Sequence, residues 1–218
     1  LLSTKQALAR QKARLQEKER EEAEARDAVR RQRNEVAIKT ELALTRLKDA
    51  NAARAQAERE LAAFEKASSE IEAMLARVQR AGVSGGAYSG SWGGSFLRPV
   101  PGRITSPFGW RIHPLTHTRR FHDGVDLACS GGTPIHAADK GRVVLAGWYG
   151  PYGQAVIIDH GSGMSTLYGH TRSGSLRVCN GQVVQRGQII AGVGSTGWST
   201  GNHLHFSVRR YGRPVSPY

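Results

Sequence analysis

The chain has 218 residues, 22% of them charged, and a formal net charge of +13. This length accommodates one or two domains, and the sequence contains no run of about 18 apolar residues that would span a membrane. Residues 81–218 hold four aspartates and no glutamate, which excludes zinc motifs that depend on a catalytic glutamate. The excess of positive charge predicts an anionic environment such as a cell-wall polymer, nucleic acid or acidic lipid, with solubility alone as the alternative.

A helical arm is predicted over residues 1–81. Residues 1–80 contain neither proline nor glycine and are rich in good helix formers. In the heptad series that starts at Leu1, eleven of twelve positions are apolar, whereas the companion seam is interrupted by charged residues. This pattern is typical of a coiled coil or a long amphipathic helix, about 120 Å long if unbroken. A hairpin near Asp49–Asn51 and a lone solvated helix are the alternatives. Because Leu1 falls inside the helical pattern, we expect a trimmed N-terminus and an upstream leader or anchor.

Two further segments follow the arm. Residues 82–96 are dominated by glycine and serine, which predicts a flexible linker. Over residues 97–218, short β-rich runs alternate with glycine-containing turns, and no amphipathic helical pattern of ten residues occurs. We therefore predict an α + β multidomain chain, in which the arm is tethered to a mostly antiparallel β domain and serves to localise, dimerise or regulate it.

The segment FHDGVDLA contains the first metal-competent side chains. If it is extended, His122 and Asp126 point to one side and Asp123 to the other. We therefore expect Asp126 to be a ligand and Asp123 to stabilise the turn. Taken alone, a histidine and an aspartate four residues apart are a weak signal.

Two further motifs, GNHLHF and LYGH, add three histidines. His203 and His205 flank Leu204 on a predicted strand, so both imidazoles face the same way while Leu204 packs into the core. Both can ligate one metal, or one ligates while the other reaches a metal-bound water; packing alone is the alternative. His170 ends a predicted strand, and Tyr168 is expected on the same face.

The C-terminal domain resembles the lysostaphin/LytM-like zinc endopeptidases, which cut peptide bonds in bacterial peptidoglycan. The resemblance covers about Pro101 to Pro217 and rests on motifs in the family's order and spacing: FGWRIHP, FHDGVDLA, GTPIHAA, GRVVLAG, LYGHT, GQVVQRGQIIAGVGSTGWSTG and NHLHFSVR. It implies a small antiparallel β domain with a substrate groove. Two positions depart from the family pattern, since Ser207 stands where many members carry glutamate and Cys129 where proline is frequent.

The resemblance also implies a role for each site residue. One zinc ion would be held by His122, Asp126 and His205, and the metal-bound water would be flanked by His170 and His203. Three protein ligands leave one position for a water, whose pKa zinc lowers to about 7. In the absence of glutamate, His170 and His203 would share proton transfer and stabilisation of the oxyanion.

Three alternatives compete with a simple hydrolase. An arm joined to this domain also resembles the non-catalytic activators of murein amidases in cell division, whose domain has lost its zinc ligands. The presence of all five site residues favours catalysis. An arm that covers the groove until a partner removes it would add regulation. A nucleic-acid binder is disfavoured because no recognised motif occurs and the aromatic residues do not interleave with the basic ones.

Two cysteines bear on the compartment. A disulfide between Cys129 and Cys179 is predicted, with two ordinary thiols as the alternative. Together with the peptidoglycan substrate, a disulfide favours an extracytoplasmic bacterial location, either secreted, periplasmic or associated with the cell wall. The expected partners are peptidoglycan and, for the arm, either a second copy of the same coiled coil or a division or cell-wall protein.

Overall fold

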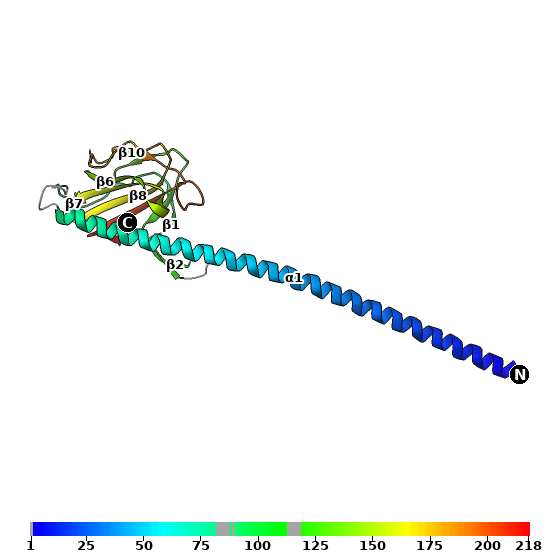
Figure 1. Ribbon diagram of the computed structural model, residues 1–218. Helices are drawn as coiled ribbons and strands as arrows, with labels where there is room; N and C mark the ends of the chain where they lie inside the picture. The colour runs from blue at the N-terminus through cyan, green and yellow to red at the C-terminus, as the bar shows by residue number, and fades with distance from the viewer. Residues whose placement is uncertain (1, 82–87, 89, 113–118) are drawn as a thin grey trace. The chain divides into compact units, whose positions relative to one another are not determined.

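The computed structural model describes residues 2–81, 88, 90–112 and 119–218 (Figure 1). Much of the glycine- and serine-rich segment, together with His113 and His117, lies outside the described residues. The chain divides into two compact units, Leu1–Arg54 and Ala55–Tyr218. Each unit is treated by itself below.

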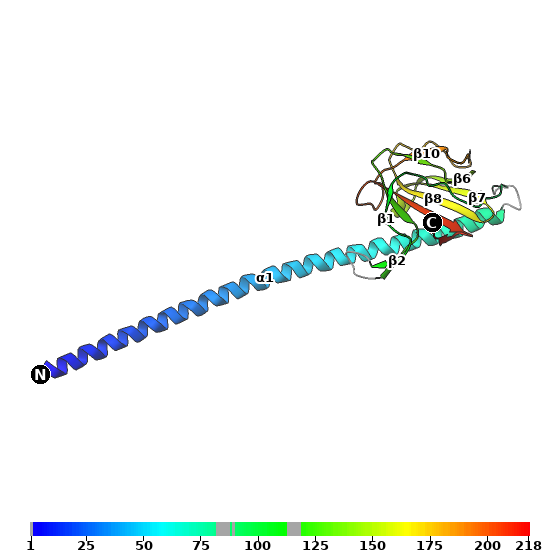
Figure 2. The same cartoon turned by 180° about the vertical axis from the view of Figure 1, so that it is seen from behind.

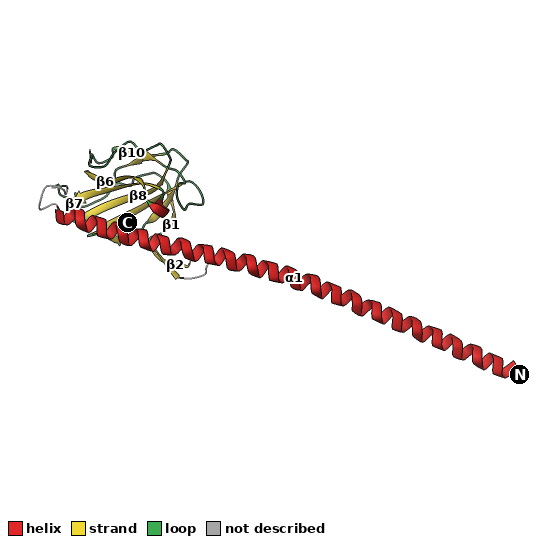
Figure 3. Cartoon of the chain, viewed as in Figure 1, coloured by secondary structure: helices red, strands yellow, loops and turns green. Residues whose placement is uncertain are grey.

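A single helix, α1 (Leu2–Ala81), accounts for the N-terminal segment (Figure 3). It ends immediately before Gly82, as expected where glycine terminates a run of strong helix formers. The helix continues through Asp49–Asn51, so the alternative of a hairpin at that point is wrong. Within the described part of the chain, no helix has both the length and the hydrophobicity needed to cross a membrane.

In the first unit, the described side chains of α1 are not buried against any other described residue. All side chains described from residue 6 to residue 54 are exposed. They include members of the predicted apolar seam, such as Leu8 at 68% and Val36 at 62% exposure. Pairs such as Glu35 and Lys39, four residues apart, stabilise such a helix by only about 0.3–0.5 kcal/mol each.

The second unit is an antiparallel β domain with the last turns of α1. The strands are β1 (Arg103–Ser106), β2 (Gly109–Ile112), β3 (Arg119–His122), β4 (Val125–Ala128), β5 (Pro134–His136), β6 (Gly141–Trp148), β7 (Gln154–Gly161), β8 (Met164–Thr171), β9 (Val183–Val184), β10 (Ile189–Gly192), β11 (His203–Arg210) and β12 (Arg213–Val215). A short 3-10 helix, η2 (Gly150–Tyr152), joins β6 to β7. One eight-stranded sheet has the order β1-β4-β11-β8-β7-β6-β9, with β12 paired to β11. Two separate two-stranded sheets pair β2 with β3 and β5 with β10. The predicted antiparallel domain is therefore confirmed.

The two faces of the large sheet have different roles. On β11, the alternate residues Leu204 and Phe206 are fully buried in the main apolar core, where they meet Tyr168 and Ile158. The residues between them, which include His203 and His205, face the opposite side because side chains alternate along a strand. The alternation predicted from GNHLHF is thus observed, and it places the histidines on the face away from the main core.

That second face is partly covered by the C-terminal part of α1. Ile71 and Leu75 are fully buried against Ile157 of β7 and Leu167 of β8. Figures 1 and 2, seen from opposite sides, show this end of the helix running along these strands. The apolar residues of α1 after about residue 55 therefore pack against the β domain. The division of the chain into arm, linker and domain at residues 82–96 stays a prediction.

The two cysteines are free thiols, Cys129 partly buried and Cys179 exposed. The predicted disulfide between them is therefore wrong for this structure. Cys129 follows β4, which pairs with β1 and β11, whereas Cys179 lies in the loop before β9, at the far edge of the same sheet. The separation of these strands in the sheet accounts for the absence of a bond.

We predict that Ile71→Ala lowers the free energy of unfolding of the β domain by about 2–5 kcal/mol, because it removes a fully buried side chain. Ile38→Ala is the matched control on the same helix, where the side chain is 68% exposed, and should change stability by less than about 0.5 kcal/mol. Urea denaturation followed by tryptophan fluorescence measures both. Equal effects of the two substitutions would show that α1 does not pack on the sheet.

Candidate metal centre

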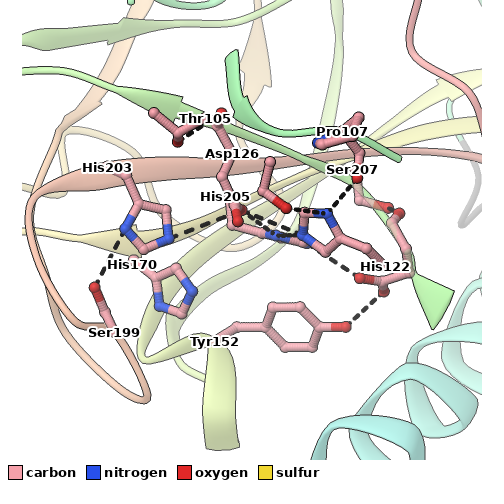
Figure 4. Close-up of polar contacts among 12 residues, drawn as sticks. Thr105, Pro107, His122, Asp126, Tyr152, His170, Ser199, His203, His205 and Ser207 are labelled. Atoms are coloured by element: carbon pink, nitrogen blue, oxygen red, sulfur yellow. Dashed lines mark hydrogen bonds and ion pairs between the residues drawn. The ribbon is translucent and has the colours of Figure 1, made fainter. Parts of the chain in front are cut away.

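Three donor atoms converge on the second face of the large sheet, the face away from the main core (Figure 4). His122 comes from the end of β3, Asp126 from β4, and His205 from the neighbouring position on β11. The Nε2 of His122 lies 3.2 Å from the Nδ1 of His205 and 3.3 Å from an oxygen of Asp126. The same oxygen of Asp126 lies 3.0 Å from the Nδ1 of His205. The structure therefore brings together the three residues expected as ligands.

This triangle fits a zinc ion. Zinc bound tetrahedrally to nitrogen and oxygen at about 2.0–2.1 Å sets its donor atoms about 3.3–3.4 Å apart. The observed separations of 3.0–3.3 Å are close to that value. Two imidazoles and one carboxylate also match the donor types of a zinc site that keeps one position open for water.

The far nitrogen of each ligand histidine faces an acceptor, which leaves the near nitrogen free to bind metal. The Nδ1 of His122 lies 2.8 Å from the carbonyl oxygen of Pro107. Since a carbonyl oxygen only accepts, Nδ1 carries the proton and Nε2 keeps its lone pair. The Nε2 of His205 lies 3.2 Å from the carboxylate of Asp123, so its Nδ1 is the metal-facing nitrogen. Such acceptors fix the tautomer and ring orientation of metal ligands.

The two other histidines stand beside the triangle. The ring centroids of His170 and His203 are 4.7 Å apart, and the Nε2 of His203 lies 3.8 Å from an oxygen of Asp126. Each Nδ1 lies 2.8 Å from a backbone carbonyl oxygen, that of Thr196 for His170 and that of Gly201 for His203. By the same argument, each residue presents an unprotonated Nε2. The pair is therefore arranged to accept or hold a proton next to the three donor atoms.

His170 is held in an unusual backbone conformation. Its φ of +58° lies in the left-handed region, which residues other than glycine rarely adopt. Such conformations cost on the order of 1–3 kcal/mol and cluster at functional sites. The prediction that Tyr168 shares a face with His170 is wrong, because Tyr168 packs in the main core while the His170 ring meets His203. The positive φ interrupts the strand's alternation, and no pattern in LYGH signals it.

The segment FHDGVD is a turn between two strands and not one extended strand. β3 ends at His122 and β4 begins at Val125, with a bend at Asp123 and Gly124. The bend, rather than alternation along one strand, brings His122 and Asp126 together. Glycine is required there, since a Cβ at Gly124 would lie 2.8 Å from the ring of His205.

Charge within the site favours ionised carboxylates. Burial acts to raise the pKa of Asp126, but hydrogen bonds and charges from His122 and His205 outweigh it and hold the pKa well below its usual range. Burial acts to lower the pKa of His205, yet Asp123 and Asp126 raise that pKa to about 9. Without metal, a proton on His205 therefore takes the place of the cation between the two carboxylates.

The pKa of His170 is shifted in the opposite direction from that of His205. Burial, followed by the neighbouring charges of His205 and His203, lowers the pKa of His170 to about 3. At neutral pH this imidazole is therefore uncharged and able to accept a hydrogen bond. Its environment differs from that of His205 because no carboxylate lies within hydrogen-bonding distance of it among the described residues.

Comparison with known proteins gives concordant results. Residues 120–217 match peptidase family M23. The DD-carboxypeptidase/endopeptidase Mpg of Neisseria meningitidis is 47% identical over 126 residues, which cover 57% of this chain and 29% of that protein. The murein hydrolase activator EnvC of Escherichia coli is 33% identical over 177 residues, which cover 76% of this chain and 40% of that protein.

A solved structure shows the same fold. A zinc-containing peptidase from Vibrio cholerae superposes with a TM-score of 0.53 at 38% identity, covering 56% of this chain and 39% of that one. This chain spans 29% of the length of Mpg and 40% of the length of EnvC.

We predict that zinc binding at pH 7 releases about one proton per chain, because the Nδ1 of His205 must lose its proton before it can ligate. The number released should fall by about one as the pH rises through about 9, which leaves only the proton given up by the metal-bound water. Calorimetric titration in buffers of different ionisation enthalpy measures this number. His136→Gln, which alters a histidine outside the site, is the control and should leave it unchanged. Zinc binding without proton release at pH 7 would contradict the assignment.

Proposed function

Residues 120–217 match peptidase family M23, and from this premise we propose that the chain is a zinc-dependent endopeptidase that hydrolyses peptide bonds in bacterial peptidoglycan. The observation that carries the proposal is the convergence of His122, Asp126 and His205 within 3.3 Å, with two further imidazoles beside them. The cross-links and bridges of peptidoglycan are the proposed substrates, in keeping with the endopeptidase and murein names of the relatives. Peptidoglycan lies outside the cytoplasm, so the proposed site of action is extracytoplasmic.

In this proposal the metal ligands are His122, Asp126 and His205. Zinc supplies Lewis-acid activation of water and of the scissile carbonyl. His170 orients the attacking water, since its low pKa keeps Nε2 available as an acceptor at neutral pH. His203, whose side chain is 18% exposed, receives the proton and passes it to the leaving amine nitrogen. This division of labour needs no glutamate.

The C-terminal part of α1 is proposed to regulate access to the site. The Phe64 ring stacks edge-on against Tyr152 and Trp198, with centroids 5.3 and 5.6 Å away. The ring of Tyr152 in turn lies 5.4 Å from that of His205. Phe64 is thus separated from a proposed metal ligand by one aromatic ring. A long peptide substrate approaching from this side would have to displace the helix.

The exposed seam of the N-terminal unit suggests a partner for the arm. Apolar side chains such as Leu8, Leu15 and Val36 follow a heptad spacing and are at least 60% exposed. We propose that a second coiled-coil segment, from another copy or from a cell-wall protein, covers them. Binding of this kind would localise the enzyme or shift α1.

A second function has one observation in its favour. The likeness to EnvC extends over 76% of this chain, against 57% for Mpg, so it reaches beyond the β domain into the arm. The alternative is a non-catalytic activator of a separate murein amidase. An intact set of donor atoms favours hydrolysis. Incubation of the zinc-loaded chain with purified peptidoglycan, followed by mass spectrometry, separates the two, since tight zinc binding without released peptides would favour the activator.

We predict that His170→Asn keeps zinc affinity within about twofold and lowers the hydrolysis rate by about 10²–10⁴-fold, the usual contribution of a positioned acid–base group. Asparagine is chosen because it tolerates the left-handed backbone at this position. His160→Asn, in a buried histidine bonded to Thr166, is the control for fold and should leave hydrolysis near the wild-type rate. A normal rate in His170→Asn would remove His170 from the mechanism.

We predict that Phe64→Ala raises the rate of peptidoglycan hydrolysis, because it removes the ring packed beside Tyr152 and Trp198. Val36→Ala, at an exposed position on the same helix, should leave the rate unchanged. Both rates are measured by release of soluble fragments from labelled peptidoglycan. Equal rates in Phe64→Ala and wild type would argue against shielding by α1.

A further inference from the structure

A buried carboxylate outside the metal triangle connects it to the helix. Asp123 was expected to stabilise a turn, but its carboxylate makes contacts far along the chain. One oxygen accepts hydrogen bonds from Tyr152 at 2.6 Å and from Ser68 of α1 at 3.2 Å. The same oxygen pairs with the guanidinium of Arg209 at 2.5 Å. The other oxygen lies 3.2 Å from the Nε2 of His205.

We propose that Asp123 is a positioning residue, which holds His205 with its Nδ1 directed at the metal and thereby sets the metal affinity of the site. The inference rests on the proposed zinc function and assigns a new role within it. Acceptors of this kind fix the tautomer of a ligating imidazole and raise its basicity. Asp123 acts through His205 and touches neither the metal nor the substrate.

Burial makes this contact decisive for His205. Its side chain is 5% exposed, so water does not substitute as an acceptor for Nε2. Among the described residues, Nε2 has no well-aligned hydrogen-bond partner, and the carboxylate of Asp123 is the acceptor within reach. An amide at this position would turn its oxygen toward the three donors Tyr152, Ser68 and Arg209 and its NH2 group toward Nε2, which favours the tautomer that protonates Nδ1 and blocks ligation.

The surroundings of Asp123 keep it ionised and fixed. Burial acts to raise its pKa, but His205, Arg209 and the hydroxyl of Tyr152 outweigh burial and hold the pKa well below its usual range. Arg209 is 1% exposed, and its guanidinium also donates to the backbone oxygen and the hydroxyl of Ser68. The chain of contacts therefore runs from α1 through Ser68 and Asp123 to His205. A displacement of α1 would alter the support of a metal ligand.

The test is a zinc titration of the full chain in the absence of substrate, with a chromophoric chelator as competitor. Asp123→Asn should weaken zinc binding about 10–100-fold, the usual effect of removing such a partner. Asp159→Asn is the matched control, because Asp159 is also buried, on β7 of the same sheet, and lies outside the contacts of His205. It should lose stability and keep its zinc affinity.

A spectroscopic readout separates positioning from general damage. In the zinc-loaded wild type, the Nε2 proton of His205 should give a downfield NMR signal that Asp123→Asn shifts and Asp159→Asn leaves in place. If Asp123→Asn does not fold, Tyr152→Phe tests the positioning role instead. It removes only the hydroxyl that donates to Asp123, so it should weaken zinc binding less than the roughly 10–100-fold expected for Asp123→Asn. Ser68→Ala tests the connection to α1 in the same way.

Zinc affinity within twofold of wild type in folded Asp123→Asn, or in Tyr152→Phe if the former does not fold, overturns the inference. This outcome differs from failure of the proposed hydrolysis. A wild-type chain that binds zinc but releases no peptides would refute the enzymatic function and leave the role of Asp123 measurable. Normal hydrolysis together with unchanged zinc affinity in the variants would refute only the positioning role.

Discussion

Three donor atoms held within 3.3 Å of one another set the requirements for the rest of the β domain. Two imidazoles and a carboxylate crowded this closely need either a cation or a proton between them. Without metal, His122 and His205 outweigh burial and depress the pKa of Asp126, while Asp123 and Asp126 outweigh burial and raise the pKa of His205. The position between these donor atoms is filled either by a proton on His205 or, in the proposed function, by zinc. The proposed catalysis and the predicted proton release both depend on the exchange of one for the other.

The two faces of the large sheet separate the main core from the site residues. Alternation along β11 sends Leu204 and Phe206 into the main core and His203 and His205 to the other side. A rigid, fully buried face thus anchors the strand that carries two site histidines, and preorganisation of this kind is what a catalytic site requires. The helix packs on the same side as the site, so the proposed control of access and the proposed chemistry would share one surface.

Much of this could be predicted from the sequence, for physical reasons that differ between elements. Periodicity identified the helix and the common face of His203 and His205, because both signals are local. Sequence reasoning failed for residues whose role depends on contacts with distant parts of the chain. Asp123 looked like a turn residue, since the buried partners that define it, Ser68 and Arg209, lie 55 and 86 residues away. The left-handed backbone of His170 has no signature in the residues around it.

X-ray absorption spectroscopy of the zinc-loaded chain tests the central claim most directly. The account predicts one zinc per chain with a shell of nitrogen and oxygen atoms at about 2.0–2.1 Å, two imidazoles and no sulfur. A shell that contains sulfur from Cys129 or Cys179, or a third imidazole in place of the carboxylate, would contradict it.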